Sequence, residues 1–230
     1  MADPRYRNEL SAMRLLIVNP NSTSEMTDRI GAEARNHLPD GVALTLRTND
    51  SGPAAIQGAA DGKAAIPGAL ALLKDTPCDV AVIGCFDDIG LSDVPADGPA
   101  AVIGLGEAAI RTADRSGRRF AVLTTSDLSV PVLEANLRAY GAEANCVCVQ
   151  ASMIGVLDFE RNRVAASQRL IAAARRLLDA HPDIETIVLG CAGMGGLASD
   201  MAGALHIPVI DPIEAAIGMA LQRHAQNTAK

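Results

Sequence analysis

An internal repeat constrains the fold of this 230-residue chain more than any other feature of its sequence. Three blocks of the first half return in the same order in the second half, displaced by 105, 106 and 107 residues. The repeat pairs residues 14–19 with 119–124, 79–85 with 185–191, and 101–110 with 208–217. Apolar strands resemble one another by chance, but these blocks also share Gly-Cys and Glu-Ala-Ala-Ile. The repeat therefore predicts two similar lobes related by a pseudo-twofold axis.

Short apolar runs alternate with segments of helical periodicity along both halves. Residues 80–84 are apolar throughout and 186–190 are apolar after Thr186, whereas residues 163–180 carry apolar side chains at helical spacing. Fully apolar strands separated by helices are typical of parallel sheets that are covered on both faces. We therefore expect an α/β fold with two pseudo-symmetric lobes, each a mostly parallel sheet flanked by helices, and an active site in the cleft between them.

The repeat also sets the expected domain boundaries. We expect a first lobe at residues 14–110 and a second lobe at 118–211, with a C-terminal helix at 212–225 packing back on the first lobe. Residues 1–13 are polar and lack the apolar core of a signal peptide, so we expect a flexible extension there and a cytoplasmic protein. No apolar run reaches the roughly 18 residues that a membrane span needs.

The composition narrows the class of partner. The net charge of -7 repels phosphate backbones, and the 2% aromatic content leaves few platforms for base stacking. The five cysteines are an odd number, which argues against a disulfide framework, and their spacing does not predict a metal site. We expect a small-molecule substrate, no nucleic-acid or membrane partner, no cofactor or metal, and a homo-oligomer.

Two cysteines occupy equivalent positions in the repeat. Cys85 and Cys191 each follow a glycine at the carboxyl end of an apolar strand. The residues after them begin a turn whose free N–H groups can stabilise an anion, which predicts thiols with a lowered pKa. Two such bases facing one cleft fit a two-base racemisation, in which one removes a proton and the other returns one to the opposite face.

Polar, turn-forming segments follow other strands at the same predicted edge. They lie at residues 19–23, 51–53 and 124–126. Ligands of open α/β sheets bind beyond the carboxyl ends of the strands, so these segments are candidate hydrogen-bond donors to a substrate. Ordinary turns and helix caps use the same residue types, and that interpretation remains open for each segment.

Several motifs together resemble the hydantoin racemase family. They are Asn-Pro-Asn at 19–21, Ser-Gly-Pro at 51–53, Cys-Phe-Asp-Asp at 85–88, Leu-Gly-Cys-Ala-Gly-Met at 189–194 and Pro-Val-Ile-Asp at 208–211. This family belongs to the aspartate/glutamate racemase superfamily and includes allantoin racemases. The resemblance implies cofactor-independent racemisation of 5-substituted hydantoins or allantoin.

The resemblance also implies roles for individual residues. The two catalytic cysteines of the family correspond to Cys85 and Cys191. Its polar ligand contacts correspond to Asn21, Ser51, Gly52, Thr124 and Thr125. We add the residues that follow each cysteine as expected substrate contacts, which are Phe86, Asp87, Ala192 and Gly193.

Two departures from the family pattern bear on the substrate. Ile89 stands where many members have proline after Cys-Phe-Asp-Asp. The segment 58–63 lacks the aromatic residue of the family and keeps only Asp61 of its acidic residues. If this segment lines the pocket, we expect a substrate that differs from the usual hydantoins.

Three carboxylates lie near the predicted site. Asp87 and Asp88 could bond a ligand or hold their own loop, and the sequence supports both interpretations equally. Asp211 follows a strand as a potential supporting group, but its counterpart in the first half is Gly104, so the repeat does not support that role.

Two alternatives stay open. A racemase or isomerase of the same superfamily could act on an amino acid or a small dicarboxylate, although Asn19-Pro-Asn21 replaces the Asp-Ser-Gly that is usual in amino-acid racemases. A decarboxylase would need only one cysteine. A two-lobed small-molecule-binding protein would need neither, and protection of both thiols by a substrate would argue against it.

Overall fold

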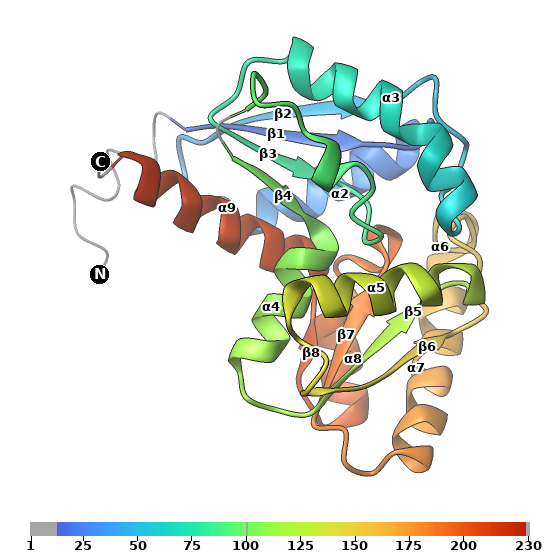
Figure 1. The fold of residues 1–230 in the computed structure, drawn as a ribbon. Coiled ribbons are helices and arrows are strands. Elements are labelled where there is room, and N and C mark those ends of the chain that lie inside the picture. Colours follow the sequence, from blue (N-terminus) through green and yellow to red (C-terminus); the bar gives the residue numbers. More distant parts are fainter. Residues whose placement is uncertain (1–12, 100, 229–230) are drawn as a thin grey trace.

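Two four-stranded parallel sheets form the framework of the protein (Figure 1). The computed structural model describes residues 13–99 and 101–228. The first sheet has the order β2-β1-β3-β4 and contains β1 (Arg14–Asn19), β2 (Ala43–Thr48), β3 (Val80–Ile83) and β4 (Val102–Gly104). The second has the order β6-β5-β7-β8 and contains β5 (Phe120–Thr124), β6 (Cys146–Ala151), β7 (Thr186–Gly190) and β8 (Val209–Ile210). The predicted α/β fold with two lobes is confirmed.

The two sheets share their strand order and their register. Leu15 of β1 pairs with Val80 of β3, and Phe120 of β5 pairs with Thr186 of β7 at the equivalent position. The outer strands also correspond, because β4 pairs with β3 as β8 pairs with β7. The strand pairings therefore follow the offsets that the sequence repeat sets.

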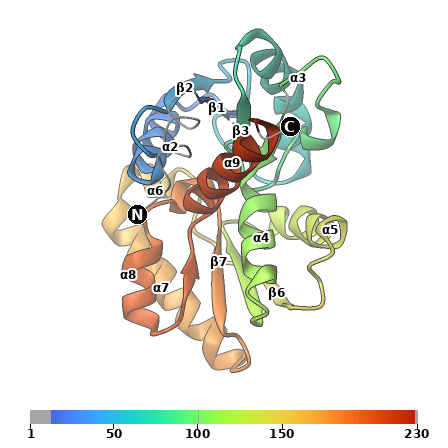
Figure 2. The ribbon, with the colours of Figure 1, turned by 90° about the vertical axis from the view of Figure 1, so that its left-hand side faces the viewer.

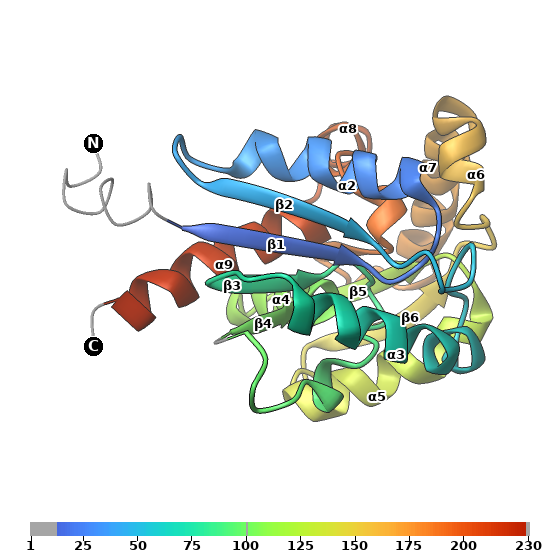
Figure 3. The same cartoon turned by 90° about the horizontal axis from the view of Figure 1, so that it is seen from above.

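Helices follow most of the strands and cover the sheets. They are α2 (Ser24–His37), α3 (Ala59–Asp75), α4 (Leu105–Arg115), α5 (Val130–Tyr140), α6 (Asp158–Arg161), α7 (Arg163–Ala180), α8 (Ala198–Leu205) and α9 (Pro212–Thr228). Figure 3 shows α2 and α3 on opposite sides of the first sheet. Residues alternate between the two faces of a strand, so a sheet covered on both sides needs strands that are apolar at every position.

The core of the first lobe divides along this alternation. Leu16 and Val18 of β1 pack with Leu73 of α3, whereas Leu15 and Ile17 belong to the larger cluster with α2 and α9. That larger cluster continues into the second lobe. The two lobes therefore share this larger apolar cluster, which keeps their strand ends close together.

The C-terminal helix α9 joins the two lobes. It packs against α2, β3 and β4 of the first lobe, along α4, and against β7 of the second lobe (Figure 2). Met13 was assigned to a flexible extension, but its side chain is fully buried in the core. Residues 1–12 of that predicted extension lie outside the described residues. Within the described ranges, no helix combines the length and the apolar character needed to cross a membrane.

Candidate active site

A pocket lies between the lobes at the carboxyl ends of the central strands. Its lining comes from both halves of the repeat and includes Asn21, Met26, Ile56, Gly84, Cys85, Phe86, Asp87, Thr124, Thr125, Ser129, Val156, Gly190, Cys191 and Ala192. Its free volume is about 30 Å³. The lining matches the edge of the sheets where open α/β folds bind ligands.

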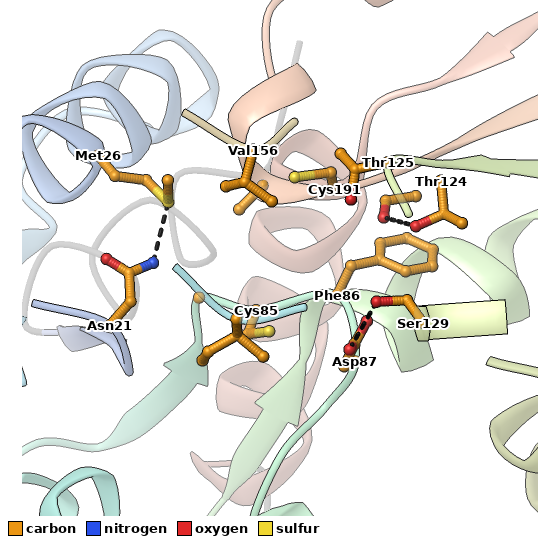
Figure 4. Close-up of a pocket in the computed structure, with 14 residues that line it drawn as sticks. Asn21, Met26, Cys85, Phe86, Asp87, Thr124, Thr125, Ser129, Val156 and Cys191 are labelled. Atoms are coloured by element: carbon orange, nitrogen blue, oxygen red, sulfur yellow. Dashed lines mark hydrogen bonds between the residues drawn. The ribbon is translucent and has the colours of Figure 1, made fainter. Parts of the chain in front are cut away.

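Cys85 and Cys191 lie on opposite sides of this pocket (Figure 4). The glycine before each cysteine packs tightly against the neighbouring strand. A Cβ on Gly84 would meet the Val18 carbonyl oxygen at 3.1 Å, and a Cβ on Gly190 would meet Thr124 at 3.0 Å. A side chain at either strand end would require the neighbouring strand to shift by a few tenths of an ångström, so glycine fits both positions. The two thiols enter the pocket from equivalent positions.

Burial raises the pKa of both thiols. The pKa of Cys85 lies well above its usual value because of desolvation, with Asp87 and the second cysteine adding to the shift. Desolvation also raises the pKa of Cys191 to about 12. The prediction of lowered pKa values was wrong, because it considered the N–H groups of the turns and left out the cost of burying a thiolate.

The two thiols nevertheless differ in their hydrogen-bond donors and in the charges beside them. Backbone N–H groups of Gly193 and Met194 donate to Cys191 and oppose the rise in its pKa. Cys85 receives such a bond from the Asp87 N–H alone, while the carboxylates of Asp87 and Asp88 raise its pKa further. Of the two cysteines, Cys191 is therefore the one whose thiolate is better stabilised.

Asp87 joins the pocket to three neighbouring segments. Its carboxylate accepts a 3.0 Å hydrogen bond from Ser129 Oγ and another from the Gly58 N–H. Asn136 Nδ2 of α5 donates to its carbonyl oxygen at 3.1 Å. Burial raises the pKa of Asp87 to about 6. Above that pH the carboxylate is an acceptor at the wall of the pocket.

Asp88 turns away from the pocket and holds the following helix. Its carboxylate accepts from the Gly106 and Glu107 N–H groups at 2.9 and 2.6 Å, and from the Tyr140 hydroxyl at 2.7 Å. Burial raises the pKa of Asp88 to about 7. These bonds satisfy free N–H groups at the start of α4, so Asp88 has the structural role of the two that the sequence left open.

Asp211 has the corresponding role in the second lobe. It accepts from the Ile213 N–H at 2.8 Å at the start of α9 and from the Gly196 N–H at 2.6 Å in the loop after Cys191. The expectation that the repeat argues against a supporting role was wrong. In the first lobe the carboxylate that bonds the helix start is Asp88 of the cysteine loop. In the second lobe it is Asp211, at the end of β8.

Asn21 and Thr124 are oriented by bonds to their own lobes. Asn21 Oδ1 accepts from Asn19 Nδ2 at 2.9 Å and from the Thr23 N–H at 3.0 Å. This directs the Asn21 amide nitrogen toward Met26 Sδ, 3.0 Å away. Thr124 Oγ1 donates to the Gly190 carbonyl at 3.0 Å, which ties β5 to the strand that ends at Cys191.

The predicted contact residues fall into two groups. Asn21, Phe86, Asp87, Thr124, Thr125 and Ala192 line the pocket with the two cysteines. Ser51 and Gly52 do not line it, since Ser51 Oγ donates to Asn49 Oδ1 at 2.7 Å and Gly52 packs under the Pro20 carbonyl. Gly193 approaches the site through its N–H at Cys191. Ligand contacts of Ser51 and Gly52 stay a prediction.

Six lining residues were not predicted as ligand contacts, and two of them are Gly84 and Gly190, the glycines that precede the cysteines. Met26 and Ile56 come from the first lobe, and Ser129 and Val156 come from the second. Met26 follows the Asn-Pro-Asn motif closely, and Ser129 follows the polar segment 124–126 closely, so both carried some sequence signal. Ile56 and Val156 lie in connecting segments whose composition is ordinary, and only the folded chain brings them to the pocket.

The two departures from the family pattern touch each other. A Cβ on Gly62 would meet Ile89 Cγ2 at 2.9 Å. Gly58, at a positive φ of 88°, precedes α3 and donates its N–H to Asp87. The segment 58–63 therefore supports a wall of the pocket from behind, through Asp87 and Ile89.

The site offers no cationic side chain to a ligand. None of the lining residues is Lys, Arg or His, and Asp87 is the one carboxylate among them. Among residues 13–99 and 101–228, no group of three or more His, Cys, Asp or Glu side chains is placed to hold a metal ion. The chemistry that the lining itself can supply is thiol proton transfer and hydrogen bonding.

Comparisons with known proteins identify the same class of protein. Residues 15–220 match the Asp/Glu/hydantoin racemase family. A hydantoin racemase of Rhizobium meliloti is 38% identical over 213 residues, which cover 90% of this chain and 87% of that protein. A hydantoin racemase of Paenarthrobacter aurescens is 32% identical over 90% of this chain and 89% of its own.

A solved structure shows the same similarity in three dimensions. The allantoin racemase from Klebsiella pneumoniae superposes with a TM-score of 0.86 at 31% identity, covering 94% of this chain and 89% of that chain. The fold, the paired strand ends and these matches define an isomerase of the racemase class. The chain belongs to the Asp/Glu/hydantoin racemase family.

Proposed function

We propose that this protein racemises a 5-substituted hydantoin or allantoin without a cofactor, with Cys85 and Cys191 as its two bases. One observation carries the proposal: the two thiols face each other across a single pocket from equivalent strand ends of the two lobes. A planar carbanion formed between them can be protonated from either side. Two bases on opposite faces are what inversion of one carbon requires.

The chemistry of the ring suits a thiol base. The C5–H of a hydantoin lies beside a carbonyl, so its removal leaves an enolate whose charge spreads onto the C4 oxygen. One cysteine breaks the C5–H bond and forms S–H, and the other gives up its S–H proton to C5 on the opposite face. The roles of the two cysteines exchange for the other enantiomer, and no net proton is consumed.

The environment of the thiols supports a choice of starting roles for the two cysteines. Cys191 has two N–H donors, whereas Cys85 lies beside Asp87 and Asp88. We therefore place the first thiolate at Cys191 and the first thiol at Cys85. The raised pKa of both thiols means that the active form becomes more populated as the pH rises above neutrality.

The charge of the lining favours a neutral ring over an amino acid or dicarboxylate. A substrate carboxylate would need a cationic partner in so buried a site, and no lining residue supplies one. A hydantoin ring presents N–H donors and carbonyl acceptors. Asp87 can accept from a ring N–H, while Asn21 and Thr125 can donate to ring carbonyls.

Binding requires the pocket to open. The free volume of about 30 Å³ is room for roughly two water molecules, and a hydantoin ring is larger. The lining comes from both lobes, so a small separation of the lobes or a rotation of side chains such as Met26 admits the ring. Closure around it would then exclude water from the enolate.

The test is a comparison of substrate classes in D₂O. Enantiopure 5-alkyl hydantoins, allantoin, glutamate and aspartate are each incubated with the protein, and C5 or Cα exchange is followed by NMR together with optical rotation. We expect exchange and loss of rotation for the hydantoins or for allantoin, and none for the two amino acids. Exchange of the amino acids without exchange of any hydantoin would assign the site to the other branch of the superfamily.

A further inference from the structure

One peptide group in the second lobe is held from both sides. The Met194 N–H closes the turn Ala192–Met194 by donating to the carbonyl oxygen of Cys191 at 3.1 Å, and it also donates to the thiol of Cys191, whose rise in pKa it opposes. The turn passes directly over this thiol, since a Cβ on Gly193 would lie 3.7 Å from Cys191 Sγ. The carbonyl of the same peptide belongs to Gly193 and accepts a 3.1 Å bond from Arg163 Nη1. The C=O and N–H of a trans peptide point in opposite directions, so fixing the carbonyl fixes the direction of the N–H.

Arg163 is well placed to hold this loop. It is the first residue of α7, and its second guanidinium nitrogen bonds the Gly195 carbonyl. The planar guanidinium therefore bridges two carbonyls of the segment that follows Cys191. On the far side of that segment, the Gly196 N–H donates to Asp211.

Charged groups from both lobes surround this guanidinium. Arg29 of α2 forms a two-pronged ion pair with Glu160 of α6, with N–O distances of 2.7 and 2.5 Å. Burial and Arg29 lower the pKa of Arg163, and the carboxylates of Glu160, Glu33 and Asp211 oppose that shift. An arginine keeps its charge at every pH at which the protein is folded, so the loop carbonyls always face a cation.

The first lobe holds the equivalent carbonyl with a neutral group. Asp87 corresponds to Gly193 in the repeat, and its carbonyl accepts from Asn136 Nδ2 at 3.1 Å. The Asp88 N–H donates to the Cys85 carbonyl at 3.2 Å, as the Met194 N–H does at Cys191. The backbone arrangement is therefore repeated, while a cation holds it in the second lobe alone.

We propose that Arg163 is a positioning residue that directs the Met194 N–H at Cys191 and thereby favours the thiolate of that cysteine over the thiolate of Cys85. The guanidinium also polarises the peptide it holds, which makes its N–H a stronger donor. The proposal rests on the proposed function only in giving Cys191 a catalytic role. The effect on the thiol itself is a property of the free protein.

The test compares Arg163→Met with Arg161→Met, which removes an exposed cation from the preceding helix. Side-chain exposure of Arg161 is 75%, so its loss leaves the loop intact. Alkylation by iodoacetamide is measured for each cysteine by peptide mass spectrometry between pH 7 and 9. The groups facing Cys191 are Cys85, Asp87 and Glu160, and all are unchanged in both variants.

We expect Cys191 of Arg163→Met to react roughly tenfold more slowly than in the wild type, the loss of one charge-assisted hydrogen bond. Cys85 keeps its rate, Arg161→Met keeps both rates, and Arg163→Lys lies between because an ammonium can hold one carbonyl. Racemisation by Arg163→Met falls in kcat with KM within about twofold, as for a group that acts on the base and not on substrate binding.

A purely structural role gives the opposite result. A loosened loop would expose Cys191 and make it react faster in Arg163→Met, and this or an unchanged rate would overturn the proposal. Melting temperatures of the variants identify any loss of folding, and Arg163→Lys then carries the test. If the wild type racemises nothing while the alkylation pattern holds, the proposed function fails and the role of Arg163 stands.

Discussion

The two cysteine loops occupy equivalent strand ends but are built from different side chains. In the first lobe, Cys85 is followed by two buried carboxylates, and Asn136 holds the loop carbonyl. In the second, Cys191 is followed by small residues, and a guanidinium holds the same carbonyl. The repeated backbone places two thiols at one pocket, and the unequal side chains decide which thiol ionises more readily.

A second difference concerns the carboxylate that joins each loop to the next helix. Asp88 reaches from the first cysteine loop to the start of α4, and Asp211 reaches from the end of β8 to the second loop. A Cβ on Gly104, the counterpart of Asp211, would meet Asp88 Oδ1 at 2.0 Å. One carboxylate thus fills the equivalent space in each lobe. In the first lobe it comes from the cysteine loop, and in the second lobe it comes from the end of the outer strand.

The largest expected effect tests whether both loops are needed. Cys85→Ser and Cys191→Ser each lower the rate of racemisation by roughly 10³-fold or more, because each removes a positioned acid or base. Polarimetry measures the rate, and Cys148→Ser in the edge strand β6 is the matched control with the wild-type rate expected. If either pocket variant racemised at the wild-type rate, its cysteine would not be needed, and the two loops would not have equivalent roles in the reaction.

The next largest effect concerns protein stability and tests the packing of Asp88 against Gly104. We expect Gly104→Ala to lower the free energy of unfolding by about 2 kcal/mol, since its Cβ has no room beside Asp88. Gly218→Ala on the open face of α9 is the control and should be neutral or stabilising by up to about 1 kcal/mol. Urea unfolding measures both variants.

Moving the carboxylate sharpens the same comparison. The double change Asp88→Gly with Gly104→Asp places the carboxylate where the second lobe has it, and Asp88 has a positive φ of 52° that suits glycine. We expect the double variant to unfold at a higher urea concentration than Gly104→Asp alone. If the double variant were no more stable than Gly104→Asp alone, a carboxylate at position 104 would not replace Asp88, and the two lobes would not be equivalent at this contact.

Thiol reactivity reports the electrostatic difference directly. Both pKa values are raised, so both thiols are protonated at neutral pH, and alkylation accelerates as the pH increases from 7 to 9. We expect Cys191 to react several-fold faster than Cys85 because of its two N–H donors. Asp87→Asn removes a neighbouring negative charge and should raise the rate at Cys85 more than at Cys191. The reverse order of rates would contradict the assignment of Cys191 as the first thiolate.

The smallest effect concerns the contact between the lobes. Arg29 and Glu160 pair across it with 28% and 12% side-chain exposure, whereas Arg119 and Asp183 pair at the surface with 47% and 54%. We expect Arg29→Met to raise KM a few-fold by loosening closure, and Arg119→Met to change stability by less than about 1 kcal/mol and KM not at all. Steady-state kinetics separates the two variants.

The sequence predicted what depends on the repeat and on local pattern. The alternation of apolar runs indicated the parallel sheets, and the shared Gly-Cys indicated the paired thiols. The positions of Asn21 and Thr124 at the pocket also follow from strand ends that parallel sheets bring to one edge. These features need only residues that are close in sequence or related by the repeat offset.

The features that the sequence did not predict depend on long-range contacts. Arg163 reaches Gly193 and Val156 reaches the pocket only after the second lobe has folded. The pKa of the cysteines was predicted in the wrong direction because burial is a property of the assembled pocket. Asp211 was set aside because the repeat pairs it with glycine, and only the fold shows that Asp88 fills the same space.

The most direct test of the two-base mechanism follows the two half-reactions separately. Each enantiomer of the hydantoin or allantoin that the wild type racemises is incubated in D₂O with Cys85→Ser or Cys191→Ser, and C5 exchange is measured by NMR alongside optical rotation. We expect each variant to exchange the C5 proton of one enantiomer with retention, and the two variants to select opposite enantiomers. Exchange of the same enantiomer by both variants, or racemisation by either at the wild-type rate, would contradict the two-base mechanism.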